Sequence, residues 1–364
     1  MKKNIIISGI NLFEGGPLSV LNDCLLFLDK HFANNYNIIA FVHKKELIKS
    51  VNIQLIEVPN SRKSYLNRLY YEYVWFYFKS LKLKPYLWLS MHDVTPNVKS
   101  TIRAVYCHNP SPFYKMTFSE FKIEPSLGLF NMFYKFLYKF GINKNNYVIV
   151  QQNWIRNKFI EDLNVKKEII VATPTLHVES TLISNKEKNP NKSPLFFYPT
   201  FARVFKNIEC FCEASKELAD KGYNFDVYLT INGSENKYSK YLIKKYASIS
   251  NIKFIGKQSR DAVFDIYSKC DAVVFPSKLE TWGLPISEAK SFKRPILLSD
   301  LPYAHETVGT YKEVSFFNPN NSSELSRLMQ NIIEKKIIYQ GAFANEINEP
   351  YAKDWNSLFD KILN

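Results

Sequence analysis

Short apolar runs alternate with longer amphipathic stretches through the first half of the chain. The stretch Leu18–Leu28 repeats its apolar residues at the spacing of a helix that buries one face. Strands that alternate with such helices form parallel, doubly wound sheets, so an α/β fold is predicted. Six runs rich in β-branched and aromatic residues are the predicted strands: 5–7, 37–42, 53–58, 86–90, 103–107 and 147–151.

The same alternation returns in the second half of the chain, after a break. Residues 181–193, TLISNKEKNPNKS, are polar, lack a periodic apolar pattern and are predicted to be a linker. A helix is predicted to run to Leu218 with Asn207 as its capping residue. The 364 residues suit two α/β domains of ordinary size, expected at 1–180 and 194–345. The strands expected in the second domain are 195–198, 225–231, 272–275, 295–298 and 314–317.

Composition limits the class of protein. Hydrophobic residues make up 46% of the chain, which is enough for two sizeable cores. No apolar segment reaches the roughly 18 residues that a membrane span needs, and the run Ile5–Ile10 is too short for a signal peptide. The five cysteines lack the spacing of a zinc site and are interpreted as buried thiols. We therefore expect a cytoplasmic protein.

The net charge of +14 is unevenly distributed. Residues 1–180 carry 23 Lys and Arg against 13 Asp and Glu, which points to an anionic partner for the first half. Two segments there, Tyr65–Lys84 and Phe113–Lys144, combine lysines with many aromatic residues. Helices packing one face on a sheet would explain part of this pattern, but the aromatic residues exceed what one face needs. We predict a surface that rests on an anionic membrane, and no nucleic-acid binding, because no recognition motif accompanies the charge.

The stretch 271–306 carries the most specific chemistry. A predicted strand is followed by a loop with Glu280 and by a helix that Pro285 is well placed to start and that holds Glu288. Ligands of parallel sheets bind beyond the carboxyl ends of the strands, so both carboxylates are expected near the rim, where they would suit the hydroxyls of ribose and of a sugar ring. A helix cap at Glu280 and a surface Glu288 are the structural alternative. The peptide N–H groups expected to face a phosphate belong to Thr281, Trp282, Gly283 and Leu284.

Two cationic residues come just before the N-terminus of the predicted helix that ends at Leu218. Arg203 and Lys206 precede Asn207, and together they form a plausible clamp for a diphosphate. Both side chains could instead be solvated on the surface. For Lys206, solvation on the surface is the weaker of the two interpretations.

Glycines and histidines mark strand ends in the first half. Gly15 and Gly16 close the loop after the first strand and precede a helix, so backbone amides there can approach an anion, although a tight turn alone would explain them. His92 and His108 each follow a predicted strand. A histidine at a strand end is well placed for chemistry, although a lone histidine more often caps or packs.

The region around Glu280 and Glu288 resembles the Glu, seven residues, Glu signature of family 4 retaining glycosyltransferases. The resemblance implies the GT-B fold, in which two Rossmann-like domains with parallel sheets face each other across a cleft. It also implies that residues 346–364 form a C-terminal helix that crosses back to the first domain. The resemblance spans nearly the whole chain, but its motifs are specific only from about Leu195 to Asn318. The matching residues are Phe275, Pro276, Ser277, Glu280, Gly283, Leu284, Pro285, Glu288, Ala289, Pro295, Ser299, Asp300 and Glu306.

The resemblance also implies the roles of the acidic and basic residues. The donor would be a nucleotide diphosphate sugar, GDP- or UDP-linked, with no further cofactor. Glu288 would hold the ribose and Glu280 the donor hydroxyls, while Lys206 and the amides of Thr281–Leu284 would hold the diphosphate. Arg203 departs from the family pattern, because it lies three residues before the lysine rather than about six.

In the first half, the resemblance places the paired glycines Gly15 and Gly16 near the donor diphosphate. It also places a strand-end histidine against the donor sugar, facing the acceptor. His108 matches this position better than His92 does, and the residues alone leave both open.

The resulting hypothesis is a retaining hexosyltransferase of O-antigen or surface-polysaccharide synthesis. The acceptor would be a polyprenyl-diphosphate-linked saccharide, used at the cytoplasmic face of the cell membrane. Metal independence is expected because the chain has no Asp-x-Asp motif. The alternatives are a nucleotide-sugar epimerase or a phosphorylase on the same fold, and a non-catalytic module that binds glycans or membranes.

Overall fold

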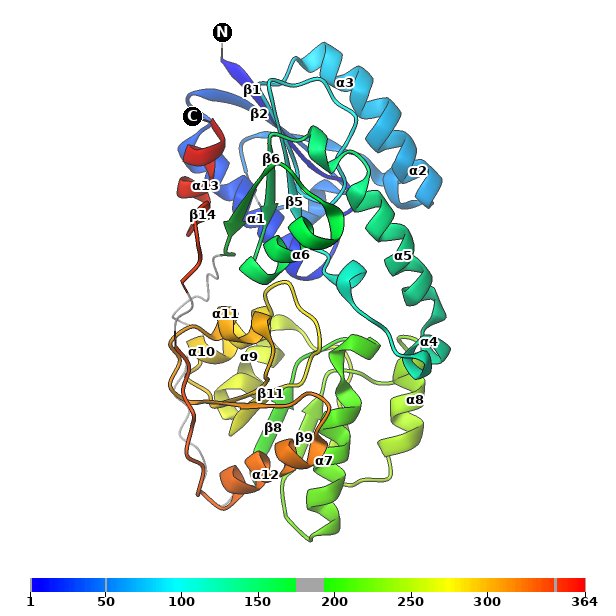
Figure 1. Cartoon of the computed structure of the whole chain (residues 1–364), viewed down its shortest axis with the longest axis vertical. Helices are drawn as coiled ribbons and strands as arrows, with labels where there is room; N and C mark the ends of the chain where they lie inside the picture. The colour runs from blue at the N-terminus through cyan, green and yellow to red at the C-terminus, as the bar shows by residue number, and fades with distance from the viewer. Residues whose placement is uncertain (1, 50, 175–192, 344–345, 364) are drawn as a thin grey trace. The chain divides into compact units, whose positions relative to one another are not determined.

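The computed structural model describes residues 2–49, 51–174, 193–343 and 346–363 of the chain. They form two compact units, each built around one parallel sheet (Figure 1), so the predicted α/β class with two parallel sheets is confirmed. The linker predicted at 181–193 lies outside the described residues, apart from Ser193. Of the described residues, the first unit comprises 2–49, 51–113, 131–174 and 347–363, and the second comprises 114–130, 193–343 and 346.

The sheet of the first unit has eight parallel strands in the order β14-β7-β6-β5-β4-β1-β2-β3. Its register places Ile6 of β1 opposite Ile39 of β2 on one side and opposite Trp88 of β4 on the other. Every residue of β4 is buried, as expected for a strand with helices on both faces of its sheet. The strands are β1 (Lys3–Gly9), β2 (Tyr36–Val42), β3 (Gln54–Glu57), β4 (Leu87–Ser90), β5 (Ile102–Cys107), β6 (Tyr147–Val150), β7 (Glu168–Ala172) and β14 (Tyr351–Ala352).

Helices cover both faces of this sheet and create two hydrophobic cores. On one face, Leu25 of α1 and Phe359 of α13 belong to the same buried cluster. The other face packs Phe76 against Phe41 and Trp88. The helices are α1 (Gly15–His31), α2 (Tyr65–Tyr70), a π-helical turn η3 (Tyr71–Trp75), α3 (Phe76–Leu83), the later part of α5 (Pro125–Lys139), α6 (Asn153–Leu163) and α13 (Trp355–Leu363). Short helical turns are η1 (Lys45–Leu47), η2 (Pro59–Arg62), η4 (Ser111–Phe113) and η5 (Ile142–Lys144).

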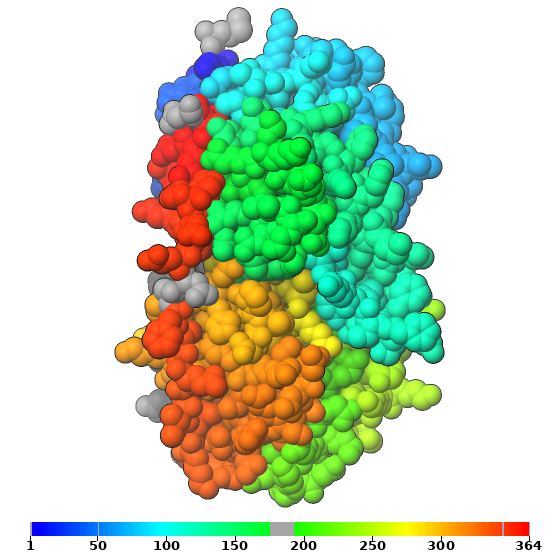
Figure 2. Space-filling model, in the orientation of Figure 1, coloured from blue at the N-terminus to red at the C-terminus, as the bar shows by residue number. Residues whose placement is uncertain are grey.

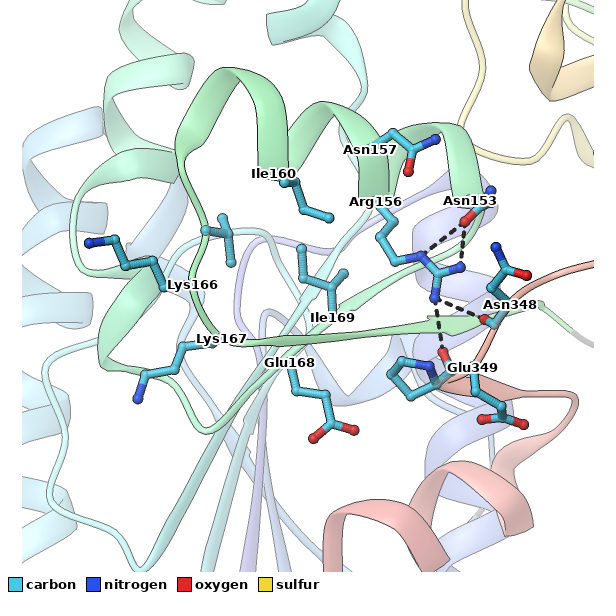
Figure 3. A pocket seen from close by; sticks show the side chains of 12 residues that line it. Asn153, Arg156, Asn157, Ile160, Lys166, Lys167, Glu168, Ile169, Asn348 and Glu349 are labelled. Atoms are coloured by element: carbon cyan, nitrogen blue, oxygen red, sulfur yellow. Dashed lines mark hydrogen bonds between the residues drawn. The ribbon is translucent and has the colours of Figure 1, made fainter.

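Arg156 of α6 holds the C-terminal segment against the first unit (Figure 3). Its Nη1 donates to the carbonyl oxygens of Asn348 at 3.0 Å and Pro350 at 3.3 Å, while its Nε donates to Asn153 Oδ1 at 2.9 Å. An open hollow of about 500 Å³ lies beside these contacts. The segment then pairs as β14 with β7, with Tyr351 opposite Val171. The end of the chain therefore completes the core of the first unit.

The second unit has six parallel strands in the order β10-β9-β8-β11-β12-β13. The strand bounds are β8 (Leu195–Tyr198), β9 (Asp226–Leu229), β10 (Ile252–Phe254), β11 (Ala272–Phe275), β12 (Ile296–Ser299) and β13 (Val314–Phe317). Its helices are α4 (Phe118–Ile123), the start of α5, η7 (Val204–Lys206), α7 (Ile208–Asp220), α8 (Lys237–Tyr246), α9 (Arg260–Lys269), α10 (Leu284–Ser291), α11 (Pro302–Val308) and α12 (Ser322–Ile333). β8 and β11 lie at the centre of the sheet, which makes their ends the natural place for a site.

Asn207 occupies the N-cap position of α7, as predicted, but its side chain does not cap the helix. Asn207 precedes the helix with a φ of 54°, and its side chain accepts no capping hydrogen bond. Instead, its Nδ2 donates to the carbonyl oxygens of Pro276 at 3.0 Å and Pro319 at 2.8 Å. The amide therefore joins the loops after β8, β11 and β13, because these buried carbonyl groups require donors.

The five cysteines are buried thiols that form no disulfide, as predicted. Among the described residues, no helix has both the length and the hydropathy to cross a bilayer.

We expect Phe359→Ala to lower the free energy of unfolding of the first unit by about 3–5 kcal/mol. Phe359 is fully buried, and its ring lies 6.0 Å from that of Phe27 and 5.5 Å from that of Phe32 between centroids. Urea titration followed by tryptophan fluorescence measures the change. The control is Asn356→Ala on the exposed side of α13, expected within about 0.5 kcal/mol of wild type. Equal losses in the two variants would contradict a core role for α13.

Candidate functional site

The ends of β8 and β11 bring the first two candidate residues together. The two strands are parallel neighbours, so their carboxyl ends share one edge of the sheet. The chain after β8 turns through η7, which ends at Lys206, and the chain after β11 leads to Glu280. Two hydrogen bonds to the Phe205 carbonyl oxygen join these loops: Lys278 N donates at 2.7 Å and Ser277 Oγ at 3.3 Å. Backbone geometry therefore brings Lys206 and Glu280 together.

Lys206 and Glu280 form an ion pair between Nζ and Oε1. Their side chains are only 9% and 13% exposed. The ammonium also lies near three rings, with Nζ 4.7 Å from the centroid of Phe201, 5.7 Å from that of Phe205 and 5.8 Å from that of Phe275. Burying an unpaired charge is costly, whereas a carboxylate and aromatic faces both stabilise a cation. Lys206 is thus a partly desolvated cation with a fixed position.

The loop of candidate phosphate-binding amides ends at Gly283, directly before α10. Gly283 has a φ of 80°, and a Cβ there would lie 3.0 Å from Ile286 Cδ1, so another residue would strain this turn. The Trp282 carbonyl oxygen accepts a hydrogen bond from Thr307 Oγ1, and Trp282 Nε1 donates to Ser287 Oγ at 3.1 Å. These contacts fix the middle of the loop at Trp282 and Gly283.

Glu288 lies in the second turn of α10 and is largely enclosed. The hydroxyl of Tyr267, from α9, lies 3.0 Å from its Oε2. Burial raises the pKa of Glu288, while the Tyr267 hydrogen bond and the charge of Arg260 oppose that rise. Burial of the Glu288 carboxyl group therefore disfavours its charged form. Its hydrogen-bond donor in this setting is the Tyr267 hydroxyl.

Arg203 is paired with a residue that the sequence did not single out. Its Nη1 donates to Glu124 Oε1 at 2.8 Å, and Glu124 Oε2 accepts from Val204 N at 2.8 Å. Glu124 comes from the segment 114–130, which belongs to the second unit. A diphosphate held by Arg203, as the resemblance implies, would have to share or replace this carboxylate.

In the first unit, His92 follows β4 and is fully buried. Its Nδ1 lies 2.8 Å from the Ser8 carbonyl oxygen and therefore donates, while Nε2 contacts Glu72 Oε1. Arg68 Nη2 donates to the His92 carbonyl oxygen at 2.9 Å. Both ring nitrogens are engaged inside the unit, so His92 is a packing residue in this arrangement.

His108 follows β5 and differs from His92 in one respect. Gln151 Nε2 lies 3.3 Å from His108 Nδ1, so Nδ1 accepts and the ring proton lies on Nε2. Within the described chain, Nε2 has no hydrogen-bond partner although it is buried. Burial lowers the pKa of His108 to about 4, which keeps the imidazole neutral at pH 7. His108 is therefore the strand-end histidine with a free donor.

Asp93 positions the backbone of His108. Its carboxylate accepts hydrogen bonds from the backbone N–H groups of His108 and Asn109 and from the hydroxyls of Tyr134 and Tyr138, both at 2.9 Å. Asp93 itself has a φ of 76°, a conformation that Asp and Asn tolerate better than most residues. One buried carboxylate thus fixes two loops and a helix.

The paired glycines lie where β1 passes into α1. Gly15 is the first residue of α1 and has a φ of 71°, which favours glycine. Gly15 and Gly16 belong to the same unit as His108, and they follow a strand two places from β5 in the sheet. The other candidates, from Arg203 to Glu288, belong to the second unit.

Several residues at these sites were missed by the sequence analysis. Asp93 could have been suspected, because an acidic residue directly follows a strand-end histidine. Tyr134 and Tyr138 share the i, i+4 spacing of one helix face, but nothing in the sequence indicates that this face points to Asp93. Glu124 gave no signal, since its partner Arg203 is 79 residues away.

Residues 179–349 match the family described as Glycosyl transferases group 1. This part of the chain is therefore similar to group 1 glycosyltransferase domains. An O-antigen chain mannosyltransferase of Salmonella typhimurium is 23% identical over 300 residues, which cover 79% of this chain and 78% of that protein. An N,N'-diacetylbacillosaminyl-diphospho-undecaprenol α-1,3-N-acetylgalactosaminyltransferase of Campylobacter jejuni is 20% identical over 245 residues, covering 64% and 62%.

Solved structures share the fold of both units. A sucrose-phosphate synthase from Thermosynechococcus elongatus superposes with a TM-score of 0.65 at 12% identity, covering 92% of this chain and 90% of that one. An Anabaena protein in complex with UDP-glucose gives a TM-score of 0.60 at 15% identity, covering 91% and 90%. The chain therefore has the GT-B fold, and the matches support a GT-B glycosyltransferase.

We expect Glu288→Gln to stabilise the second unit in a pH-dependent way. A carboxyl group whose folded pKa is raised loses stability as the pH rises from its unfolded value, near 4.5, through the folded value. Glutamine has the same shape, still accepts from Tyr267 and does not ionise. The gain over wild type should be absent below the unfolded pKa, grow as the pH rises and level off above the folded pKa. Thermal unfolding from acidic to neutral pH measures it, and a pH-independent difference would contradict a raised pKa.

Proposed function

We propose that this chain is a retaining glycosyltransferase of family 4, with Glu280 and Glu288 as its two signature carboxylates. It transfers a hexose from a GDP- or UDP-sugar to a lipid-linked saccharide during synthesis of O-antigen or another surface polysaccharide. The observation that carries the proposal is the Lys206–Glu280 pair, which is enclosed where two central parallel strands end, within the residues that match the group 1 family. The Salmonella relative supports the pathway class, and the Anabaena structure supports a nucleotide sugar as donor.

The physical role of Lys206 follows from the chemistry of the leaving group. Negative charge grows on the diphosphate as the glycosidic bond breaks, and a cation already fixed beside it stabilises that charge without reorganisation. The rings of Phe201, Phe205 and Phe275 exclude water around the ammonium, which strengthens the interaction. A diphosphate would compete with Glu280 for Lys206, and this exchange would release Glu280 to accept hydrogen bonds from the sugar hydroxyls. In this proposal the transfer needs no metal.

His108 and the acceptor complete the proposal. A neutral imidazole with its proton on Nε2 can donate a hydrogen bond to a sugar oxygen, and the burial that lowers its pKa keeps it in this form. The Campylobacter relative carries diphospho-undecaprenol in its name, which supports a polyprenyl-diphosphate-linked acceptor used at the cytoplasmic face of the membrane.

We expect Lys206→Met to weaken donor binding by about ten- to a hundredfold, because it removes one charged contact of about 1.5–3 kcal/mol. Methionine keeps the packing against the three rings but has no charge. Calorimetric titration with a panel of UDP- and GDP-sugars measures the affinity. Lys216→Ala is the matched control, because Lys216 is an exposed lysine of the same unit whose partner is Asp220. Wild-type affinity in Lys206→Met would show that the donor site is wrongly assigned.

Turnover is tested with radiolabelled donor and a membrane lipid extract. We expect label in the lipid fraction, activity that survives EDTA, and an anomeric proton in the product whose coupling matches that of the donor. Isomerised donor without transfer would indicate an epimerase, phosphate-dependent cleavage of a glycan would indicate a phosphorylase, and donor binding without any product would indicate a binding module.

A further inference from the structure

A row of apolar side chains is exposed along the helix formed by α2, η3 and α3. Leu66, Tyr70, Val74 and Phe78 recur at every fourth position, and Leu66 is 77% exposed while Phe78 is 64% exposed. In a regular α-helix a spacing of four drifts around the axis, because a turn takes 3.6 residues. The π-helical turn η3 is wider and offsets part of this drift. The four side chains therefore stay on one exposed side of the helix.

A second apolar row lies on the part of α5 that belongs to the first unit. Met132 and Phe136 are 73% and 63% exposed, and Phe140 directly after the helix is half-exposed. The two rows come together beside Tyr73, the chain neighbour of Val74, because the ring of Tyr73 lies 5.5 Å from that of Phe140. Figure 1 shows α2, α3 and α5 beside one another in this unit. We call these joined rows the apolar-basic face.

Lysines dominate the charges around the two rows, and one of them, Lys135, is paired with Asp162 of α6. Between residues 59 and 92 the only acidic residue is Glu72, which is fully buried against His92, and between 131 and 146 there is none. Lysines border both rows instead. They are Lys79, Lys82, Lys84, Lys135, Lys139 and Lys144.

We propose that the apolar-basic face docks the protein on an anionic lipid bilayer. Aromatic and aliphatic side chains would enter the boundary between headgroups and acyl chains, while the bordering lysines would contact the lipid phosphates. A second copy of the chain fits less well, because a symmetric contact through this face would bring lysines against lysines. A protein partner also fits less well, because the cores of protein interfaces are depleted in lysine.

This inference extends the proposed function without depending on it. A bilayer surface would hold the first unit where a lipid-linked acceptor is found. The docking itself needs neither donor nor acceptor, so it can be measured on its own, and its failure would leave the glycosyl transfer untouched.

We expect the full chain to sediment with phosphatidylglycerol-containing vesicles and not with pure phosphatidylcholine vesicles, and added salt should weaken the binding. Val74→Ser with Phe78→Ser should lower the partition constant at least about tenfold, because two exposed apolar side chains no longer enter the bilayer. Lys82→Gln with Lys139→Gln should lower it about fivefold per lysine at low salt. All four side chains point outward, so circular dichroism should show unchanged folding.

The matched control is Ile160→Ser with Lys167→Gln, on α6 and the following loop of the same unit. Ile160 is 52% exposed, and the control removes one apolar and one cationic side chain away from the face. It should bind like wild type. Equal binding to neutral vesicles, no binding to either vesicle, or an equal loss in the control would overturn the proposal. So would a wild-type dimer in light scattering that Val74→Ser with Phe78→Ser dissociates.

Discussion

Parallel pairing of neighbouring strands is the constraint on which both candidate sites depend. Lys206 and Glu280 are 74 residues apart in the chain, yet they touch because β8 and β11 run side by side and end at the same edge. In the first unit the same rule brings the ends of β4 and β5 together, and with them His92 and His108. A parallel sheet gathers functional groups from distant segments without requiring any long loop.

Within that frame, buried charges hold the candidate groups in place. Asp93 accepts four hydrogen bonds and fixes the backbone of His108, while the Glu72 contact fixes the ring of His92. In the second unit, Glu280 plays this part for Lys206. A buried carboxylate must find donors, and once it has several of them the surrounding loops can hardly move separately. Such rigidity is what electrostatic stabilisation of a developing charge requires.

The helix formed by α2, η3 and α3 serves the first unit on two sides. Its inner side supplies Arg68 and Glu72, which hold His92, and His92 is followed by Asp93, which holds His108. Its outer side carries exposed apolar residues and lysines. The same segment thus links the protein surface to the loop that bears the candidate histidine through a short series of direct contacts.

The sequence by itself determined most of the strands of the second unit. Apolar runs with sharp ends located five of its six described strands to within about two residues, because burial in a parallel sheet imposes continuous hydrophobicity. The short strand β10 was not among the predicted strands. The spacing of Glu280 and Glu288 pointed to a sugar-nucleotide site because that motif is local. Tertiary structure alone decided which partners the charged groups have. Glu124 on Arg203, Asp93 beneath His108 and Asn207 between three loops are contacts across distant segments, and no short-range pattern records them. It also separated His92 from His108, because hydrogen-bond partners, rather than residue type or position after a strand, leave only one of the two imidazoles with a free nitrogen.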